Sequence, residues 1–202
     1  MTRTRRIGST LVSALVLVAP SLACGFAAEQ RERIAPMAAA CDGTGDARAP
    51  AYVPGQGPHP IMALGRVRPD GAWTQSLGRL TTRTPAGGSV ERTQLVLCED
   101  PPRELELGEC AFDRVLRVGL VPVPGVRADG PSFPRVQVEQ RARIVAVASG
   151  QTIAEQVFRG ADPPPCDRSI TGEPSASDFR GAAVPSAEVD AWAEGYALDV
   201  AR

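Results

Sequence analysis

The feature that most constrains the fold of this chain is an alternating segment from Arg135 to Ala148. Its even positions are apolar or small except for Gln140, and its odd positions from Arg135 to Arg143 are charged or polar. A period of two is typical of an antiparallel strand that has one face on a core and the other in water. From Val145 onward both faces are apolar, so we expect that end of the strand to be covered.

The neighbouring segments extend this strand into a sheet. Ser149-Gly150 predicts a tight turn, because glycine readily adopts a positive φ, and the chain then returns as a partner strand over residues 151–160. Apolar, β-prone runs predict further strands at residues 61–67, 93–98 and 112–121. Pro122 and Pro124 should end the last of these, and residues 126–134 are expected to form a loop.

A helix is predicted at the C-terminal end of the chain. Val189, Trp192 and Tyr196 follow helical spacing and form one apolar stripe. Such a stripe more often packs on a core than binds a ligand. The sequence therefore predicts a mainly β fold: an antiparallel sheet or sandwich-like domain with one C-terminal helix packed on it.

The N-terminus predicts export. Arg3, Arg5 and Arg6 precede a stretch without charge from residue 7 to residue 28, as in a signal peptide. The sequence Ser21-Leu22-Ala23-Cys24 resembles a bacterial lipobox, in which the cysteine is lipidated and becomes the first residue of the mature protein. It departs from that pattern at Ser21, where Leu is preferred, and at Leu22, where a small residue is preferred.

Three interpretations of this N-terminus remain open. We favour a lipoprotein cleaved before Cys24. The alternatives are a secreted protein cleaved after Ala23 or Ala27, and an uncleaved membrane anchor, since 22 uncharged residues can just span a bilayer about 30 Å thick. All three place the domain outside the cytoplasm. The predicted organisation is a signal peptide at residues 1–23, a flexible tether at 24–50, and a single disulfide-stapled β-rich domain at 51–202.

Four cysteines remain once Cys24 is set aside: Cys41, Cys98, Cys110 and Cys166. An even set in an exported chain suits two disulfides. Four cysteines allow three pairings, and the sequence alone does not choose among them. We favour Cys98–Cys110, across a hairpin with the Pro101-Pro102 pair near its tip, which leaves Cys41 for Cys166.

The charge and the residue usage of the chain narrow the classes of partner that it can bind. The chain has no Lys and no Asn, so all 22 basic residues are Arg, which indicates a GC-rich genome rather than selection for anion recognition. After removal of residues 1–23, 19 Arg face 23 acidic residues, a net charge of −4. A mildly acidic module lacks the electrostatic footprint of a nucleic-acid-binding protein.

No group of residues predicts catalysis, a cofactor or a metal ion. His59 is the single histidine and stands in a Pro/Gly loop, and no CxxC motif occurs. Gly87-Gly88 lacks the strand–loop–helix setting of a phosphate site. Two weaker candidates are a carboxylate pair, Glu104 with Glu106, and a charged strand face, for which solvation is the simpler interpretation; this face comprises Arg135, Glu139, Arg141 and Arg143.

A series of short motifs runs along the second half of the chain: Leu95-Val96-Leu97-Cys98, Cys110-Ala111-Phe112, Ala148-Ser149-Gly150 through Ala154, Gly160 through Pro163 to Cys166, and Trp192. In this order they resemble a bacterial extracytoplasmic domain of unknown function that occurs in secreted proteins and lipoproteins. The motifs cover residues 92–200, and the resemblance implies no reaction and no catalytic residue. The chain departs from the family pattern at Ala111, where an aromatic residue is usual, and at Ser149, where Thr is commoner.

The sequence therefore predicts a non-catalytic extracytoplasmic module, tethered to the membrane through a lipid on Cys24, with a binding or structural role. Its expected partners are the membrane and an envelope protein or polymer, and not nucleic acid. The alternative from another class is a secreted or envelope-associated hydrolase that uses scattered carboxylates. A concave site that holds two acidic groups would favour the enzyme.

Overall fold

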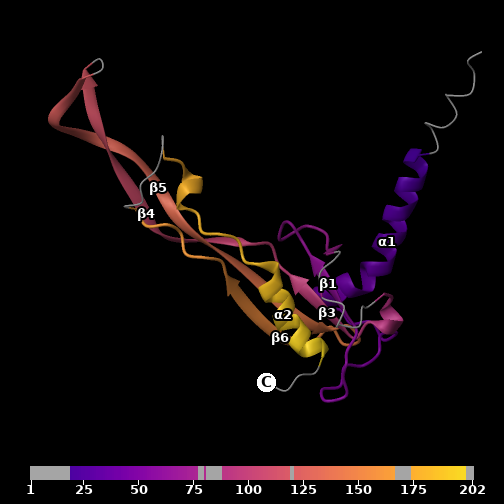
Figure 1. Ribbon diagram of the computed structural model, residues 1–202. Coiled ribbons are helices and arrows are strands. Elements are labelled where there is room, and N and C mark those ends of the chain that lie inside the picture. The colour runs from indigo at the N-terminus through magenta and orange to yellow at the C-terminus, as the bar shows by residue number, and fades with distance from the viewer. Residues whose placement is uncertain (1–18, 77–79, 81–87, 119–120, 167–173, 199–202) are drawn as a thin grey trace, which may run out of the picture.

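A computed structural model describes residues 19–76, 80, 88–118, 121–166 and 174–198 (Figure 1). The described part is mainly β, as predicted, with six strands in one sheet and a C-terminal helix packed on it. The elements are α1 (Ala19–Cys41), β1 (Ile61–Gly65), β2 (Thr74–Gln75), β3 (Leu95–Glu99), β4 (Arg103–Val118), β5 (Val121–Ala146), β6 (Thr152–Arg159) and α2 (Ser186–Ala197), with short 3₁₀ turns at Val90–Arg92 and Ala176–Phe179.

Strand β5 organises the sheet, because three other strands pair with it. Near its C-terminal end it pairs with β3, and farther back with β4. Strand β6 pairs with its other edge, so that Glu139 stands between Arg103 of β4 and Arg159 of β6. All of these pairs are antiparallel, as expected. Strand β1 departs from that expectation, because it runs parallel to β3, and the sheet is therefore mixed.

Helix α2 covers one face of the sheet. The alternation of each strand sends one set of side chains to this face, where they pack against the buried stripe of α2 around Val189 and Trp192. Trp192 makes edge-on ring contacts with Phe158 of β6 and Tyr196. The sheet residues buried here are Ile61, Ala63, Leu95, Leu97, Ala142, Ile144 and Phe158.

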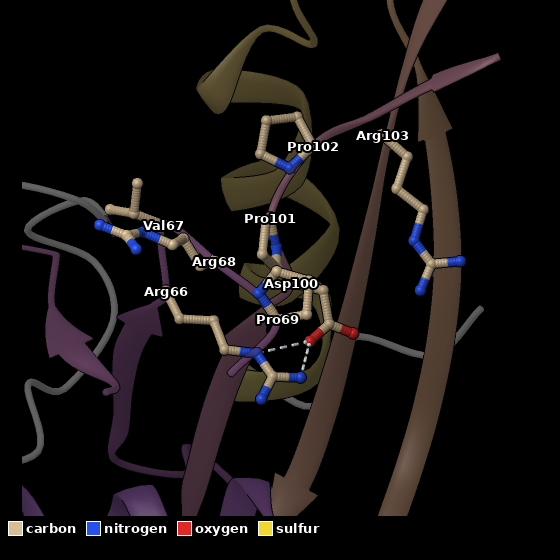
Figure 2. Close-up of a pocket in the computed structure, with 8 residues that line it drawn as sticks. All are labelled: Arg66, Val67, Arg68, Pro69, Asp100, Pro101, Pro102 and Arg103. Carbon is tan, nitrogen blue, oxygen red and sulfur yellow. Dashed lines mark hydrogen bonds and ion pairs between the residues drawn. The ribbon is translucent and has the colours of Figure 1, made fainter. Parts of the chain in front are cut away.

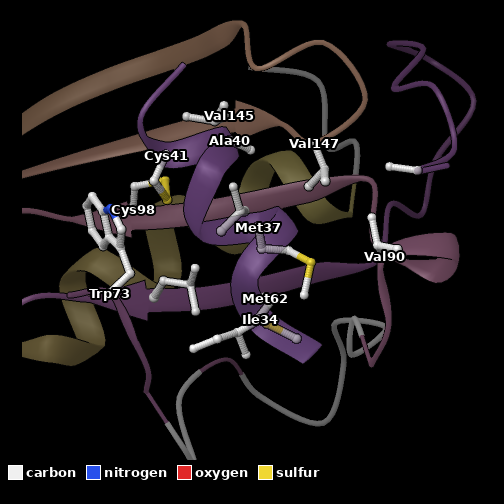
Figure 3. Close-up of a cluster of buried hydrophobic side chains, with 13 residues drawn as sticks. Ile34, Met37, Ala40, Cys41, Met62, Trp73, Val90, Cys98, Val145 and Val147 are labelled. Carbon is white, nitrogen blue, oxygen red and sulfur yellow. A yellow bond between two sulfur atoms is a disulfide. The ribbon is translucent and has the colours of Figure 1, made fainter. Parts of the chain in front are cut away.

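Helix α1 covers the opposite face, and this corrects the prediction of a flexible tether over residues 24–50. Its last two turns present Ile34, Met37, Ala40 and Cys41 to the sheet, and each of these residues is buried (Figure 3). Pro36 lies inside the helix, where it removes one backbone hydrogen bond and its ring crowds the preceding turn. Burial of the apolar stripe offsets that cost. The same face buries Val145 and Val147, which confirms that this end of β5 is covered.

The disulfides also differ from the favoured pairing. Cys41 bonds to Cys98 and Cys110 bonds to Cys166. The Pro101-Pro102 pair does not reverse the chain, because β3 and β4 run on along the same edge of β5. Twelve residues of extended chain span on the order of 40 Å, so Cys98 and Cys110 lie too far apart to bond. Cys98 instead faces α1, where Cys41 ends the helix.

Strands β4 and β5 continue as a two-stranded arm that extends away from the helices (Figure 1). The predicted strand end at Pro122 and the predicted loop at 126–134 are therefore wrong. A two-stranded arm leaves one edge of each strand unpaired, so a proline there costs no ladder hydrogen bond. The base of the arm is held by the Cys110–Cys166 disulfide and by ring contacts that Phe179 makes with Phe112 and Phe133.

The turn between β5 and β6 requires glycine, as predicted. Gly150 has a φ of 68°, and a Cβ atom there would meet the carbonyl oxygen of Gly43 at 2.6 Å. The turn thus lies directly against the loop that follows α1, which brings the end of the helix next to the β5–β6 hairpin.

We predict that the two disulfides make similar contributions to global stability but different local ones. The chain segments they close are nearly equal, with sequence separations of 57 and 56. Loop entropy then assigns each about 4 kcal/mol. Replacing Cys41 and Cys98 together by Ala should also release α1 and raise amide hydrogen exchange at residues 29–41. Urea denaturation and hydrogen-exchange mass spectrometry measure the two effects.

The matched control is the double replacement Cys110→Ala with Cys166→Ala. It should lower the urea midpoint by a similar amount while exchange in residues 29–41 stays slow. Equal exchange in the two variants, or a Cys98–Cys110 peptide in a non-reducing digest, would contradict this architecture.

Candidate functional site

The most polar buried cluster lies where β1 ends, β3 ends and β5 passes between β3 and β6. Asp100, just after β3, is 7% exposed. Its Oδ1 accepts hydrogen bonds from Nη2 of Arg66 at 2.6 Å and from Nε at 3.2 Å. Arg143 of β5 brings its Nη2 to 3.9 Å from the same oxygen. One carboxylate therefore faces two guanidinium groups.

The backbone and an aromatic ring hold this cluster in place. The N–H of Asp100 donates to the carbonyl of Arg141, and the N–H of Arg66 donates to the carbonyl of Glu99. The guanidinium of Arg66 lies 4.5 Å above the ring of Trp73, a distance suited to a cation–π contact. Trp73 in turn donates its Nε1–H to Asp42, next to the disulfide-bonded end of α1. The site is thus rigidly connected to the core.

A surface pocket of about 200 Å³ opens above this cluster (Figure 2). The side chain of Arg66 passes under it to reach Asp100, and Arg103 flanks it at the start of β4. Arg68 and Arg103 are exposed and form no ion pair with any described residue. The lining residues are Arg66, Val67, Arg68, Pro69, Asp100, Pro101, Pro102 and Arg103, three arginines against one acid.

The chemistry of this pocket is that of an anion receptor. A guanidinium group offers several N–H donors in a planar fork that matches a carboxylate or a phosphate. The one carboxylate of the lining already accepts two hydrogen bonds from Arg66. Nearby, the Nε of Arg143 is buried and has no hydrogen-bond partner among the described residues. Because Arg68 and Arg103 form no ion pair with any described residue, the pocket itself retains donor capacity and a net positive charge.

His59 has a structural environment rather than a catalytic one. It is 1% exposed, its Nδ1 lies 2.9 Å from Oε1 of Gln94, and its ring meets Tyr52 edge-on. Its backbone N–H donates to the carbonyl of Ala197 at the end of α2. The Nε2 is buried and without a hydrogen-bond partner among the described residues. These contacts attach the loop before β1 to the helix.

The two weaker candidates from the sequence do not form a site. Glu104 of the carboxylate pair accepts a hydrogen bond from Arg180, and Glu106 beside it is exposed. Arg135 donates to the carbonyls of Pro163 and Pro164 and thus anchors the chain before Cys166. These contacts support the simpler interpretation of structure and solvation.

The rest of the charged strand face forms ion pairs across the sheet. Arg141 hydrogen-bonds Glu155, and this contact lowers the pKa of the Glu155 carboxyl and raises the pKa of Arg141. Oε1 of Glu139 lies 2.8 Å from Nε of Arg159 in an ion pair, and Arg143 forms the longer ion pair with Asp100 described above. The strand face predicted at Arg135, Glu139, Arg141 and Arg143 is therefore divided among local partners.

The His, Cys, Asp and Glu residues of the described part of the chain were the remaining candidates for a metal or thiol site. No group of three or more His, Cys, Asp or Glu residues there could hold a metal ion. The described cysteine sulfurs from Cys41 onward are all in disulfides. Gly87 of the glycine pair lies outside the described residues, as do residues 1–18 of the predicted signal peptide. Cys24 lies within the backbone of α1.

Comparison with protein families, curated proteins and solved structures finds no match to this chain. The resemblance over residues 92–200 therefore stays a prediction, and no residue role comes from a relative.

Sequence reasoning missed the Arg66–Asp100 pair. The two residues are 34 positions apart, and the parallel pairing of β1 with β3 brings them together. A local signal was available in the sequence, because both residues stand where an apolar segment ends. Arg66 follows Gly65 directly, and Asp100 follows Cys98 after one position. Polar groups at the ends of neighbouring parallel strands meet at one edge of a sheet, and a parallel pairing was not predicted.

We predict that replacing Asp100 by Asn destabilises the fold by roughly 2–4 kcal/mol. The change leaves two partly buried guanidinium groups without their anion, and breaking one partner of a buried pair is costly. The exposed Arg180–Glu104 pair is the matched control, with side chains 45% and 55% exposed. Glu104→Gln should cost less than about 1 kcal/mol. Equal shifts of the urea midpoint in the two variants would contradict the assigned role of Asp100.

Proposed function

We propose that this chain is a non-catalytic extracytoplasmic lipoprotein, anchored through Cys24, that binds an anionic group of an envelope partner. The binding site is the pocket lined by Arg66, Arg68 and Arg103. The shared chemistry of the ligand is a carboxylate or phosphate, on an envelope protein or polymer. The observation that carries the proposal is the excess of guanidinium groups over carboxylates in a pocket whose Arg66 is fixed by Asp100 and Trp73.

The disulfides support the proposed location outside the cytoplasm. Two disulfides fit a protein of an oxidising environment, outside the cytoplasm. No helix in the described part of the chain is long and apolar enough to cross a membrane. The two disulfides are consistent with an extracytoplasmic or secreted protein. The lipid on Cys24 rests on the lipobox-like sequence alone, and cleavage after Ala23 or Ala27 is the secreted alternative.

The residues of the pocket support binding over catalysis. Arginine keeps its proton throughout the physiological range, so it orients and neutralises anions but does not exchange protons with a substrate. Most glycoside hydrolases, for example, place two acidic groups on either side of the bond that they cleave. The pocket lining holds only Asp100, and Arg66 hydrogen-bonds it. The arrangement therefore favours recognition of charge, and it is what would be expected of a docking module.

The lipid anchor predicts a modified N-terminus. The full chain, exported by a bacterial host that processes lipoproteins, should begin with a diacylglyceryl-cysteine at Cys24 and enter the detergent phase of a Triton X-114 extract. Cys24→Ser should lose the lipid mass. Mass spectrometry of the N-terminal peptide checks this, and an unmodified peptide that begins at Cys24 or after Ala27 would refute the anchor.

The anion pocket predicts a specific loss of binding. Fluorescence anisotropy with labelled poly-glutamate and labelled polyphosphate separates carboxylate from phosphate as the ligand. Replacing Arg68 and Arg103 together by Gln should weaken binding of the preferred probe at least tenfold, because two guanidinium groups and their positive charges leave the pocket. The fold should stay intact, since both side chains are exposed.

The matched control for this experiment is Arg48→Gln with Arg180→Gln. It also removes two positive charges, but from exposed sites outside the pocket. Binding should fall less than threefold. An equal loss in both variants would indicate only general charge attraction, and no binding of either probe to the parent protein would refute the pocket.

A further inference from the structure

Strand β6 forms an open edge of the sheet. Backbone groups of one residue point to the same side of an antiparallel strand, and the side alternates from residue to residue. The N–H of Ala146 donates to Gln151 and the N–H of Gly160 donates to Val138, so even positions of β5 face β6. Their register partners Ala154, Gln156 and Phe158 therefore face β5.

The outward positions of β6 are Glu155, Val157 and Arg159. Among the described residues, β6 pairs only with β5, and no other hydrogen bond reaches the backbone groups of these three residues. Their side chains share the face that carries Arg141 and Arg143. The side chains of Glu155 and Arg159 are 40% and 65% exposed, and Val157 is 50% exposed. Unpaired strand edges of this type are templates for another strand.

The edge is complementary to itself. In an antiparallel pair of β6 strands centred on Val157, the two Val157 residues stand opposite each other. Glu155 then stands opposite Arg159 of the second copy, twice by symmetry. All three outward residues then form hydrogen-bonded backbone pairs with the residues opposite them in the second copy. Opposite charges placed directly across two strands stabilise the pairing.

The charge pattern extends across both sheets. Within one copy, Glu155 is the register partner of Arg143, and Arg159 is that of Glu139. The proposed pairing joins these rows, so that the sign of charge alternates from Arg143 through Glu155 to the second copy's Arg159 and Glu139. A shift by two residues centres the pair on Gln156 or on Phe158 and leaves Glu155 or Arg159 opposite Val157, and a shift by four centres it on Glu155 or on Arg159 and places like charges opposite each other. Among these registers, the one centred on Val157 pairs both charged residues with opposite charges.

The other long edge of the sheet lacks this property. Arg103 and Leu105 of β4 face β5, since they pair with its odd positions, so Glu104 and Glu106 point outward. Self-pairing about Leu105 would place Glu104 against Glu106 of a second copy. Acidic residues of this kind protect an edge from association.

We propose that two copies of this chain associate through their β6 edges, antiparallel about Val157, to form one continuous sheet. The interface is isologous, as in most homodimers, and it leaves the arginine pocket at β1 and β4 away from the contact. The inference is independent of the proposed function.

Disulfide trapping tests this arrangement on the full, exported chain. The Cα atoms of a hydrogen-bonded antiparallel pair are about 5.5 Å apart, which suits a disulfide. Val157→Cys should therefore give a covalent dimer under mild oxidation, seen on a non-reducing gel. Leu105→Cys is the matched control on the β4 strand, with a similarly exposed parent side chain at 38%, and it should stay monomeric.

Charge variants of Val157→Cys test the register. Glu155→Arg alone, or Arg159→Glu alone, puts like charges opposite each other in a homodimer and should lower the yield of dimer at least fivefold. Mixing the two variants, tagged to differ in size, restores opposite charges at both positions. The mixed dimer should return to the yield of Val157→Cys, which also shows that each variant is folded. No recovery on mixing, or equal trapping through Leu105→Cys, would overturn the proposal.

Discussion

The Cys41–Cys98 disulfide holds helix α1 against the sheet. It joins the last residue of α1 to the next-to-last residue of β3, and both cysteines are buried within the same apolar cluster (Figure 3). Without α1, the strand face that contains Val96, Val145 and Val147 would lie in water. The disulfide therefore does more than close a loop. It fixes the second helical layer, so that the central strands are covered on both faces.

The same helix end also positions the candidate site. Asp42 follows Cys41 and accepts the indole N–H of Trp73, whose ring supports Arg66, and Arg66 holds Asp100. The pocket above is formed by loops, yet the loops are tied to a covalently fixed point through these contacts. Of the three arginines in the pocket, these contacts preorganise Arg66, whereas the exposed Arg68 and Arg103 have to be ordered when a ligand binds.

The sequence predicted those parts of the fold that depend on local pattern. The alternation of β5 from Arg135, the Gly150 turn, the apolar β3 and the stripe of α2 all follow from spacing, and all are confirmed. The missed features depend on long-range pairing. The burial of α1 was hidden by Pro36 and by small residues, and the prolines of β5 suggested a loop because the arm's unpaired edge is a tertiary property. The Arg66–Asp100 pair required the parallel register of β1 and β3.

The order of the disulfides along the chain has a consequence for biogenesis. Cys41 pairs with Cys98, and Cys110 pairs with Cys166. With the cysteine of the lipobox-like sequence set aside, each bridge thus joins consecutive cysteines, and the two closed segments do not overlap. A chain that crosses a membrane from its N-terminus presents Cys41 and Cys98 before the other two. An oxidase that joins cysteines in their order of arrival would make both native bridges directly, without a step of disulfide exchange.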